Sequence, residues 1–138
     1  MSDDPTTVRS VAVTRDDVVR ALELRERGGP RAVLRVNPPF AGRMRARLHV
    51  EGREGDYDDP APVHLPPNRL VRTPTPFPAA DDAEDALRAA GEYSVERQRE
   101  RHKRMVDGWR RAIRARLVNE VTIETPSGPH GVEVKVLG

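Results

Sequence analysis

Regularly spaced arginines between residues 94 and 117 are the side chains best placed to do chemistry in this chain of 138 residues. Arg97, Arg104 and Arg111 recur every seven residues, and Arg101 lies between the first two. In an α-helix this spacing puts them on one side, with a rise of about 10 Å between successive repeats. Guanidinium groups bind phosphate oxygens bidentately. The row therefore predicts a surface for a polyanion.

A second set of basic side chains has strand spacing. Arg43, Arg45 and Arg47 alternate with apolar residues, which predicts a half-buried strand over residues 43–51 with the arginines facing outward. One interpretation is a basic ladder for phosphate backbones, with Phe40 as a ring for base stacking. The other is a solvated strand face whose arginines pair with the acidic loop that follows.

Catalytic chemistry has little support in the sequence. His49, His64, His102 and His130 show no HExxH spacing and no clustered carboxylates, and no glycine-rich phosphate loop or GxSxG motif is present. The absence of cysteine excludes thiolate metal sites and a cysteine nucleophile. We therefore expect a protein that is not an enzyme, with no catalytic residue, metal or cofactor.

The net charge of +2 conceals a separation of charge along the chain. Residues 31–47 hold five arginines and no acid, whereas residues 51–59 and residues 81–92 each hold five acids and one arginine. Such clustering can build a basic face and an acidic face. A GC-rich genome raises arginine use throughout its proteins, so the placement of the arginines is more informative than their number.

One long helix over residues 94–117 is predicted to carry the arginine row. Ser94 is suited to cap its first turn. The pairs Glu100–Arg104 and Asp107–Arg111 have i,i+4 spacing and are expected to neutralise part of the row. The apolar side of the helix contains Val95, His102, Met105, Val106, Trp109, Ile113 and Leu117.

Shorter elements are predicted from apolar alternation and from turn residues. Thr14 followed by Asp17 approximates a capping box, and Gly91 is suited to end a helix. The remaining expected elements are strands over residues 8–13 and 31–37, helices over residues 14–27 and 82–90, and a hairpin over residues 121–136.

Proline shapes the middle of the chain, because residues 60–78 contain seven prolines. Proline has no backbone N–H and favours extended structure, so we expect an extended segment that wraps the domain. Its expected apolar anchors are Val63, Leu65, Leu70 and Val71.

These elements predict a single α+β domain over residues 8–138, preceded by a disordered tail over residues 1–7. Its expected core is a small, mostly antiparallel sheet packed against one long amphipathic helix, with one or two shorter helices. No stretch approaches the ~20 apolar residues that span a membrane, and the polar start of the chain lacks a signal-peptide pattern. We therefore expect a cytoplasmic protein that does not contact a membrane.

Two stretches carry a resemblance. Residues 11–23 (VAVTRDDVVRALE) and residues 31–51 (RAVLRVNPPFAGRMRARLHVE) resemble short conserved proteins of unknown function found in halophilic archaea. The resemblance covers about a quarter of the chain and contains no catalytic motif, so it implies no site and no activity. It implies a source in which most proteins are acidic, where a pI near 9.5 would favour a polyanion partner. High salt in such a source would screen phosphate contacts.

The sequence therefore predicts a non-catalytic binding protein whose partner is RNA or a ribonucleoprotein. The alternative is a protein-interaction or assembly module, including a homodimer, in which an acidic protein surface meets the basic face. The nucleic-acid hypothesis depends on the strand and helix arginines sharing one surface, and it loses its basis if they point apart or if residues 51–59 cover them. The candidate nucleic-acid-binding residues are Arg43, Arg45, Arg47, Arg97, Arg101, Arg104 and Arg111.

Overall fold

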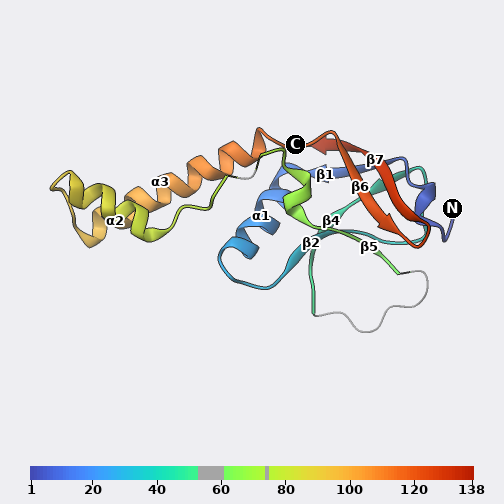
Figure 1. Ribbon diagram of the computed structural model, residues 1–138, viewed down its shortest axis with the longest axis horizontal. Helices are drawn as coiled ribbons and strands as arrows, with labels where there is room; N and C mark the ends of the chain where they lie inside the picture. Colours follow the sequence, from blue (N-terminus) through green and yellow to red (C-terminus); the bar gives the residue numbers. More distant parts are fainter. Residues whose placement is uncertain (53–60, 74) are drawn as a thin grey trace.

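The computed structural model describes residues 1–52, 61–73 and 75–138 (Figure 1). The predicted α+β class is confirmed, and one long helix is present. The described elements are η1 (Pro5–Thr7), β1 (Ser10–Thr14), α1 (Arg15–Glu26), β2 (Ala32–Val36), β3 (Arg43–Arg45), β4 (Arg47–Val50), β5 (Val63–Leu65), η2 (Pro67–Leu70), α2 (Ala80–Ala89), α3 (Val95–Arg114), β6 (Glu120–Thr125) and β7 (Gly128–Leu137).

The described strands form two sheets, where the sequence predicted one. The four-stranded sheet has the order β3-β1-β7-β6, with β1 parallel to β3 and β7 and with β6 and β7 forming the predicted hairpin. The three-stranded sheet has the order β4-β2-β5 and is antiparallel throughout. Helix α1, capped by Thr14 as predicted, packs against β2, β4 and η2.

The strand predicted over residues 43–51 crosses from one sheet to the other. Ala46 is fully buried at the crossing and donates its N–H to the carbonyl oxygen of Ala12 at 2.9 Å. Before Ala46 the chain pairs with β1, and after it the chain pairs with β2. The predicted single ladder of outward arginines is therefore interrupted between Arg45 and Arg47.

One apolar core joins residues from both sheets, α1 and the C-terminal half of α3. Phe40, the candidate stacking ring, is fully buried in this core and cannot stack on a base. The four predicted anchors of the proline-rich segment are buried, which confirms their role: Val63, Leu65, Leu70 and Val71.

The first seven residues, for which we predicted a disordered tail, include η1. The Asp4 carboxylate caps this turn by accepting from the backbone N–H of Thr6 at 2.9 Å. Ser2 forms a β-bridge with Phe40, and each residue donates its N–H to the other's carbonyl at 2.6 Å. These contacts place the chain start against the buried turn around Phe40.

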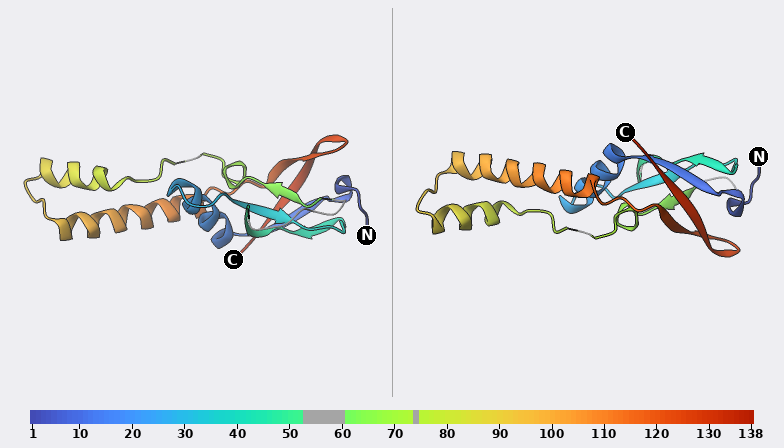
Figure 2. Two further views of the ribbon diagram at one scale, coloured as in Figure 1. Left: turned by 90° about the horizontal axis from the view of Figure 1, so that it is seen from below. Right: turned by 90° about the horizontal axis from the view of Figure 1, so that it is seen from above.

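Helix α2 and the N-terminal half of α3 extend away from the sheets as a helical hairpin (Figures 1 and 2). We call α2 and residues 95–107 of α3 the arm. Gly91, with φ of +71°, lies in its turn, a conformation that glycine adopts readily. The Ser94 hydroxyl accepts from the N–H of Arg97 at 3.1 Å, as predicted for the N-cap of α3.

The second half of the proline-rich segment runs along α3 and is held through its carbonyl groups. Prolines lack an N–H but keep a carbonyl acceptor, so donors must come from elsewhere. The ring of Phe77 also meets Trp109 edge to face, with 5.0 Å between centroids. Trp109 is buried and His102 is half-buried, on the side of α3 that was predicted to be apolar. The donor–acceptor pairs are Gln98 Nε2 to Ala80 O at 3.1 Å, His102 Nε2 to Pro78 O at 2.9 Å and Trp109 Nε1 to Thr75 O at 2.9 Å.

Candidate nucleic-acid interface

The arginine row predicted on the long helix is exposed on α3. We call Arg97, Arg101, Arg104 and Arg111 the arm face, of which Arg111 lies four residues beyond the arm on the same helix. All four side chains are exposed, and Arg97 donates from Nη1 to the Glu92 carbonyl at 3.1 Å. Within the described part of the chain, no ion pair involves any of these four arginines. Their charge is therefore available to a partner.

The expected neutralisation of the row does not occur among the described residues. Asp107 pairs with Arg110, its Oδ1 lying 2.8 Å from Nη1, instead of with Arg111. Glu100 forms no ion pair with Arg104. Asp107 can pair with Arg110 because Arg110 lies one turn further along the helix, on the side of α3 that meets α1. The arm face consequently keeps more of its charge than the sequence suggested.

The strand arginines do not join the arm face. Arg43 is exposed on β3, whereas Arg47 is exposed on β4 in the other sheet, opposite Arg35. Arg45 is half-buried, and its Nε is buried without a hydrogen-bond partner in the described chain. We call the two sheets together with α1 the body. Both strands belong to the body, while the N-terminal half of α3 lies in the arm (Figures 1 and 2). The two candidate sets therefore do not form one surface. The nucleic-acid hypothesis loses the shared basic surface on which it depended, and only the arm face remains as its candidate site.

The acidic loop proposed to pair with the strand arginines falls largely on residues 53–60, which lie outside the described residues. At its start, the carboxylate of Glu51 lies 3.6 Å from Arg31 Nε and 3.2 Å from His64 Nδ1. The His64 ring is 5.8 Å from the ring of His49, whose nitrogens lie 3.1–3.2 Å from Arg35 Nη1. This cluster links all three strands of the β4-β2-β5 sheet.

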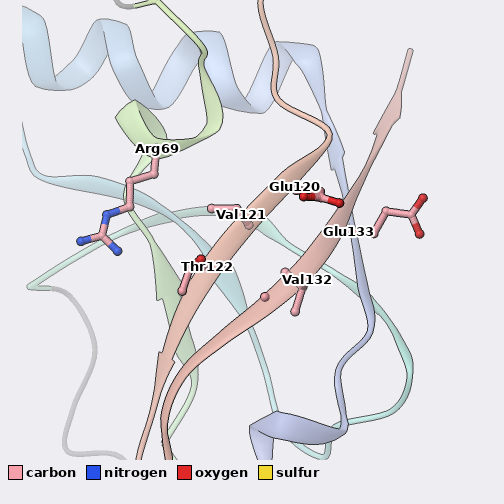
Figure 3. A pocket seen from close by; sticks show the side chains of 7 residues that line it. Arg69, Glu120, Val121, Thr122, Val132 and Glu133 are labelled. Atoms are coloured by element: carbon pink, nitrogen blue, oxygen red, sulfur yellow. The ribbon is translucent and has the colours of Figure 1, made fainter.

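A cavity of about 760 Å³ lies along the hairpin of β6 and β7 (Figure 3). Glu120 and Glu133 are partners across the two strands and both carry carboxylates, while Arg69 points away from them. The charged groups that line the cavity therefore do not converge on one point. None of the seven lining residues was predicted to carry function.

A metal site and a membrane-spanning helix are both absent from the described residues. No group of three or more histidine and carboxylate side chains lies close enough together to hold a metal ion. No described helix combines the length and the apolar character that crossing a bilayer requires.

A second basic surface of α3 was missed by the sequence analysis. A groove of about 310 Å³ lies between the C-terminal end of α1 and α3. The i,i+4 spacing of Arg99 and Lys103 is visible in the sequence, but the contribution from α1 depends on the tertiary fold. We call this the basic groove, lined by Arg27, Arg99, His102, Lys103, Val106 and Arg110.

One carboxylate organises the groove electrostatically. Glu23 on α1 accepts from Arg110 Nε at 2.7 Å and lies 3.5 Å from Arg27 Nε. The hydrogen bond from Arg110 is the main reason that the pKa of Glu23 is lowered from its usual 4.5. The same hydrogen bond raises the pKa of Arg110. Both groups therefore stay charged at neutral pH.

Comparison with known proteins identifies a family and no function. No curated protein and no solved structure matches the chain. The model of one family, described as Domain of unknown function (DUF8009), matches residues 1–138. The chain belongs to this family of proteins of unknown function.

Proposed function

We propose that this protein binds RNA without catalysis, alone or in a ribonucleoprotein, through the arm face on α3. The observation that carries the proposal is the row of exposed arginines without ion-pair partners in the described chain, on a helix that extends away from the body. Free guanidinium groups bind phosphates without first breaking internal ion pairs.

The shape of the arm supports this use. A projecting helical hairpin brings its charges to a large polymer without a clash between that polymer and the sheets (Figure 2). The steps between successive arm-face arginines are four, three and seven residues, which correspond to rises of about 6, 4.5 and 10.5 Å along the helix axis. Several phosphates of one strand can therefore be contacted together, and the contacts carry no base specificity.

The strand arginines have a smaller part in this proposal. Arg43 and Arg47 lie on different sheets of the body, and the Nε of Arg45 is buried. They offer a matched control, because Arg43 and Arg47 are exposed cations that can be neutralised without touching the arm.

The test compares two double variants with the same loss of charge. Fluorescence anisotropy at low salt would measure the affinity of wild type, R101Q/R104Q and R43Q/R47Q for labelled single-stranded RNA, duplex RNA and duplex DNA. Loss of two phosphate contacts is expected to weaken RNA binding of R101Q/R104Q by about tenfold or more, and R43Q/R47Q by less than about threefold. Absence of wild-type binding to all three probes would overturn the proposal.

A second candidate is a homodimer formed by the arm. The carboxylates of Asp81 and Asp85 are exposed on α2, beside the exposed arginines of α3. The arm of one copy therefore presents an acidic helix to the basic helix of another. Light scattering after gel filtration would show a dimer at low salt that dissociates at high salt, because exposed ion pairs are screened.

The source and the compartment are part of the proposal. The resemblance to haloarchaeal proteins supports a cytoplasm of high ionic strength, in which phosphate contacts are weakened. RNA binding should therefore be measured both at low salt and at molar potassium chloride. Retention of measurable affinity at high salt would fit a haloarchaeal cytoplasmic role.

A further inference from the structure

We propose that the basic groove between α1 and α3 binds a phosphate group. The groove uses residues separate from the arm face, so the inference goes beyond the proposed RNA contacts and stands independently of them. The groove lies where the arm meets the body. At 100° per residue around the axis of α3, Glu96 and Glu100 fall between the side that lines the groove and the arm face.

The groove lies between α3, which supplies five of the six lining residues, and Arg27, which directly follows α1. It has a volume of about 310 Å³, enough for a phosphate group with part of the molecule that carries it. Val106, only 3% exposed, contributes an apolar side chain to its lining. An apolar wall lowers the local dielectric and strengthens the attraction between cations and a bound anion.

Two of its guanidinium groups are held in place. Arg110 is fixed between Glu23, at 2.7 Å, and Asp107, at 2.8 Å. The Arg27 guanidinium lies over the ring of Phe77, 5.0 Å from its centroid. Fixed groups lose little side-chain freedom when a ligand binds, so they form a pre-organised half of the site.

The other two cations are available to a ligand. Arg99 and Lys103 lie one turn apart on α3, are exposed, and take part in no ion pair among the described residues. Their side chains can close over an anion seated beside Arg27 and Arg110. The fork of a guanidinium and the point charge of an ammonium together suit phosphate oxygens.

The charge of the groove also favours a phosphate. Arg27, Arg99, Lys103 and Arg110 contribute four positive charges, and Glu23 and Asp107 contribute two negative charges. The excess of two positive charges among these six groups matches the charge of a phosphate dianion. A carboxylate ligand would leave part of this excess uncompensated.

Isothermal titration calorimetry with pyrophosphate and with ADP would test the groove, using R99Q/K103Q and the matched variant R43Q/R47Q. Both variants remove two charges from exposed positions, and R43Q/R47Q leaves the arm and the groove untouched. Loss of two direct contacts should weaken binding of both probes by about tenfold or more in R99Q/K103Q, against less than about threefold in R43Q/R47Q. Far-UV circular dichroism would confirm equal helix content.

Two results would overturn the inference. One is absence of binding of either probe by the wild type at millimolar concentration and low salt. The other is equal weakening by the two variants, which would show a response to net charge instead of a groove. Neither result bears on the arm face, because RNA binding by R101Q/R104Q is measured separately.

The source of the phosphate is resolved by a paired RNA probe. A short RNA with a 5′-phosphate is compared with the same RNA ending in a 5′-hydroxyl, in wild type and in R99Q/K103Q. If the terminal phosphate tightens wild-type binding and this gain is absent from R99Q/K103Q, the groove holds an RNA end. If ADP binds and the two RNAs bind equally, the groove holds a free nucleotide.

Discussion

Arg110 joins α3 to α1 by donating from Nε to the carboxylate of Glu23, with 2.7 Å between Nε and Oε1. The same guanidinium donates from Nη1 to Asp107 at 2.8 Å. Because Arg110 lies on α3 three residues beyond the arm, this pair helps to fix the direction in which the arm leaves the body.

Replacing Glu23 with glutamine should lower the free energy of unfolding at pH 7. The pair is partly exposed, so the expected loss is about 0.5–1 kcal/mol. Urea denaturation followed by circular dichroism measures it. Glu26→Gln is the matched control, since Glu26 is exposed on the same helix and forms no ion pair within the described residues.

The contribution of Glu23 should depend on pH with a defined sign. Its pKa is lowered in the folded protein from the usual 4.5, so its stabilisation is complete above pH 4.5 and is lost as the pH falls through the lowered pKa. The difference between wild type and Glu23→Gln should therefore shrink as the pH falls from about 5 through the lowered pKa. A difference that stays constant over this interval would show that the pKa is not lowered.

Replacing Gly108 with alanine should stabilise the protein. A Cβ at this position would meet only the Arg111 Nη2 atom at 3.7 Å, an ordinary contact, and the residue has no positive φ. Alanine is favoured over glycine inside a helix by about 1 kcal/mol, so the unfolding free energy should rise by about that amount. A fall in thermal and urea stability would reveal a close approach that the structure does not contain.

The indole N–H of Trp109 should contribute to the attachment of the proline-rich segment. Trp109→Phe keeps an aromatic ring but removes the donor to the Thr75 carbonyl, at an expected cost of about 1–2 kcal/mol. Trp109→Ala also leaves a cavity in the core and should lower the free energy of unfolding by about 3–5 kcal/mol. Both are measured by urea denaturation, and equal stability of wild type and Trp109→Phe would contradict the role of this hydrogen bond.

Local signals in the sequence were sufficient to predict most elements. Ser94 and Thr14 cap their helices because a hydroxyl oxygen satisfies a free N–H in the first turn, a purely local interaction. The apolar alternation of the hairpin likewise identified β6 and β7. These predictions needed no knowledge of distant residues.

Tertiary relationships could not be predicted from the same signals. The alternation around Ala46 is compatible with one strand, and only the positions of β1 and β2 determine that the chain changes sheet there. Basic residues both precede and follow Asp107 along α3. Arg110 is the partner that Asp107 contacts, and the same guanidinium is held by Glu23 on α1, which the sequence does not place there. The basic groove remained hidden for the same reason, because Arg27 follows α1 and lies far from the other lining residues in the sequence.

The salt dependence of RNA affinity is the most direct test of the central proposal. For single-stranded RNA, log affinity against log salt concentration has a slope of about −0.7 for each phosphate contact. Replacing Arg101 and Arg104 with glutamine should therefore reduce the magnitude of the slope by about 1.4, while R43Q/R47Q leaves it unchanged. A slope that is the same in wild type and R101Q/R104Q would contradict RNA binding through the arm face.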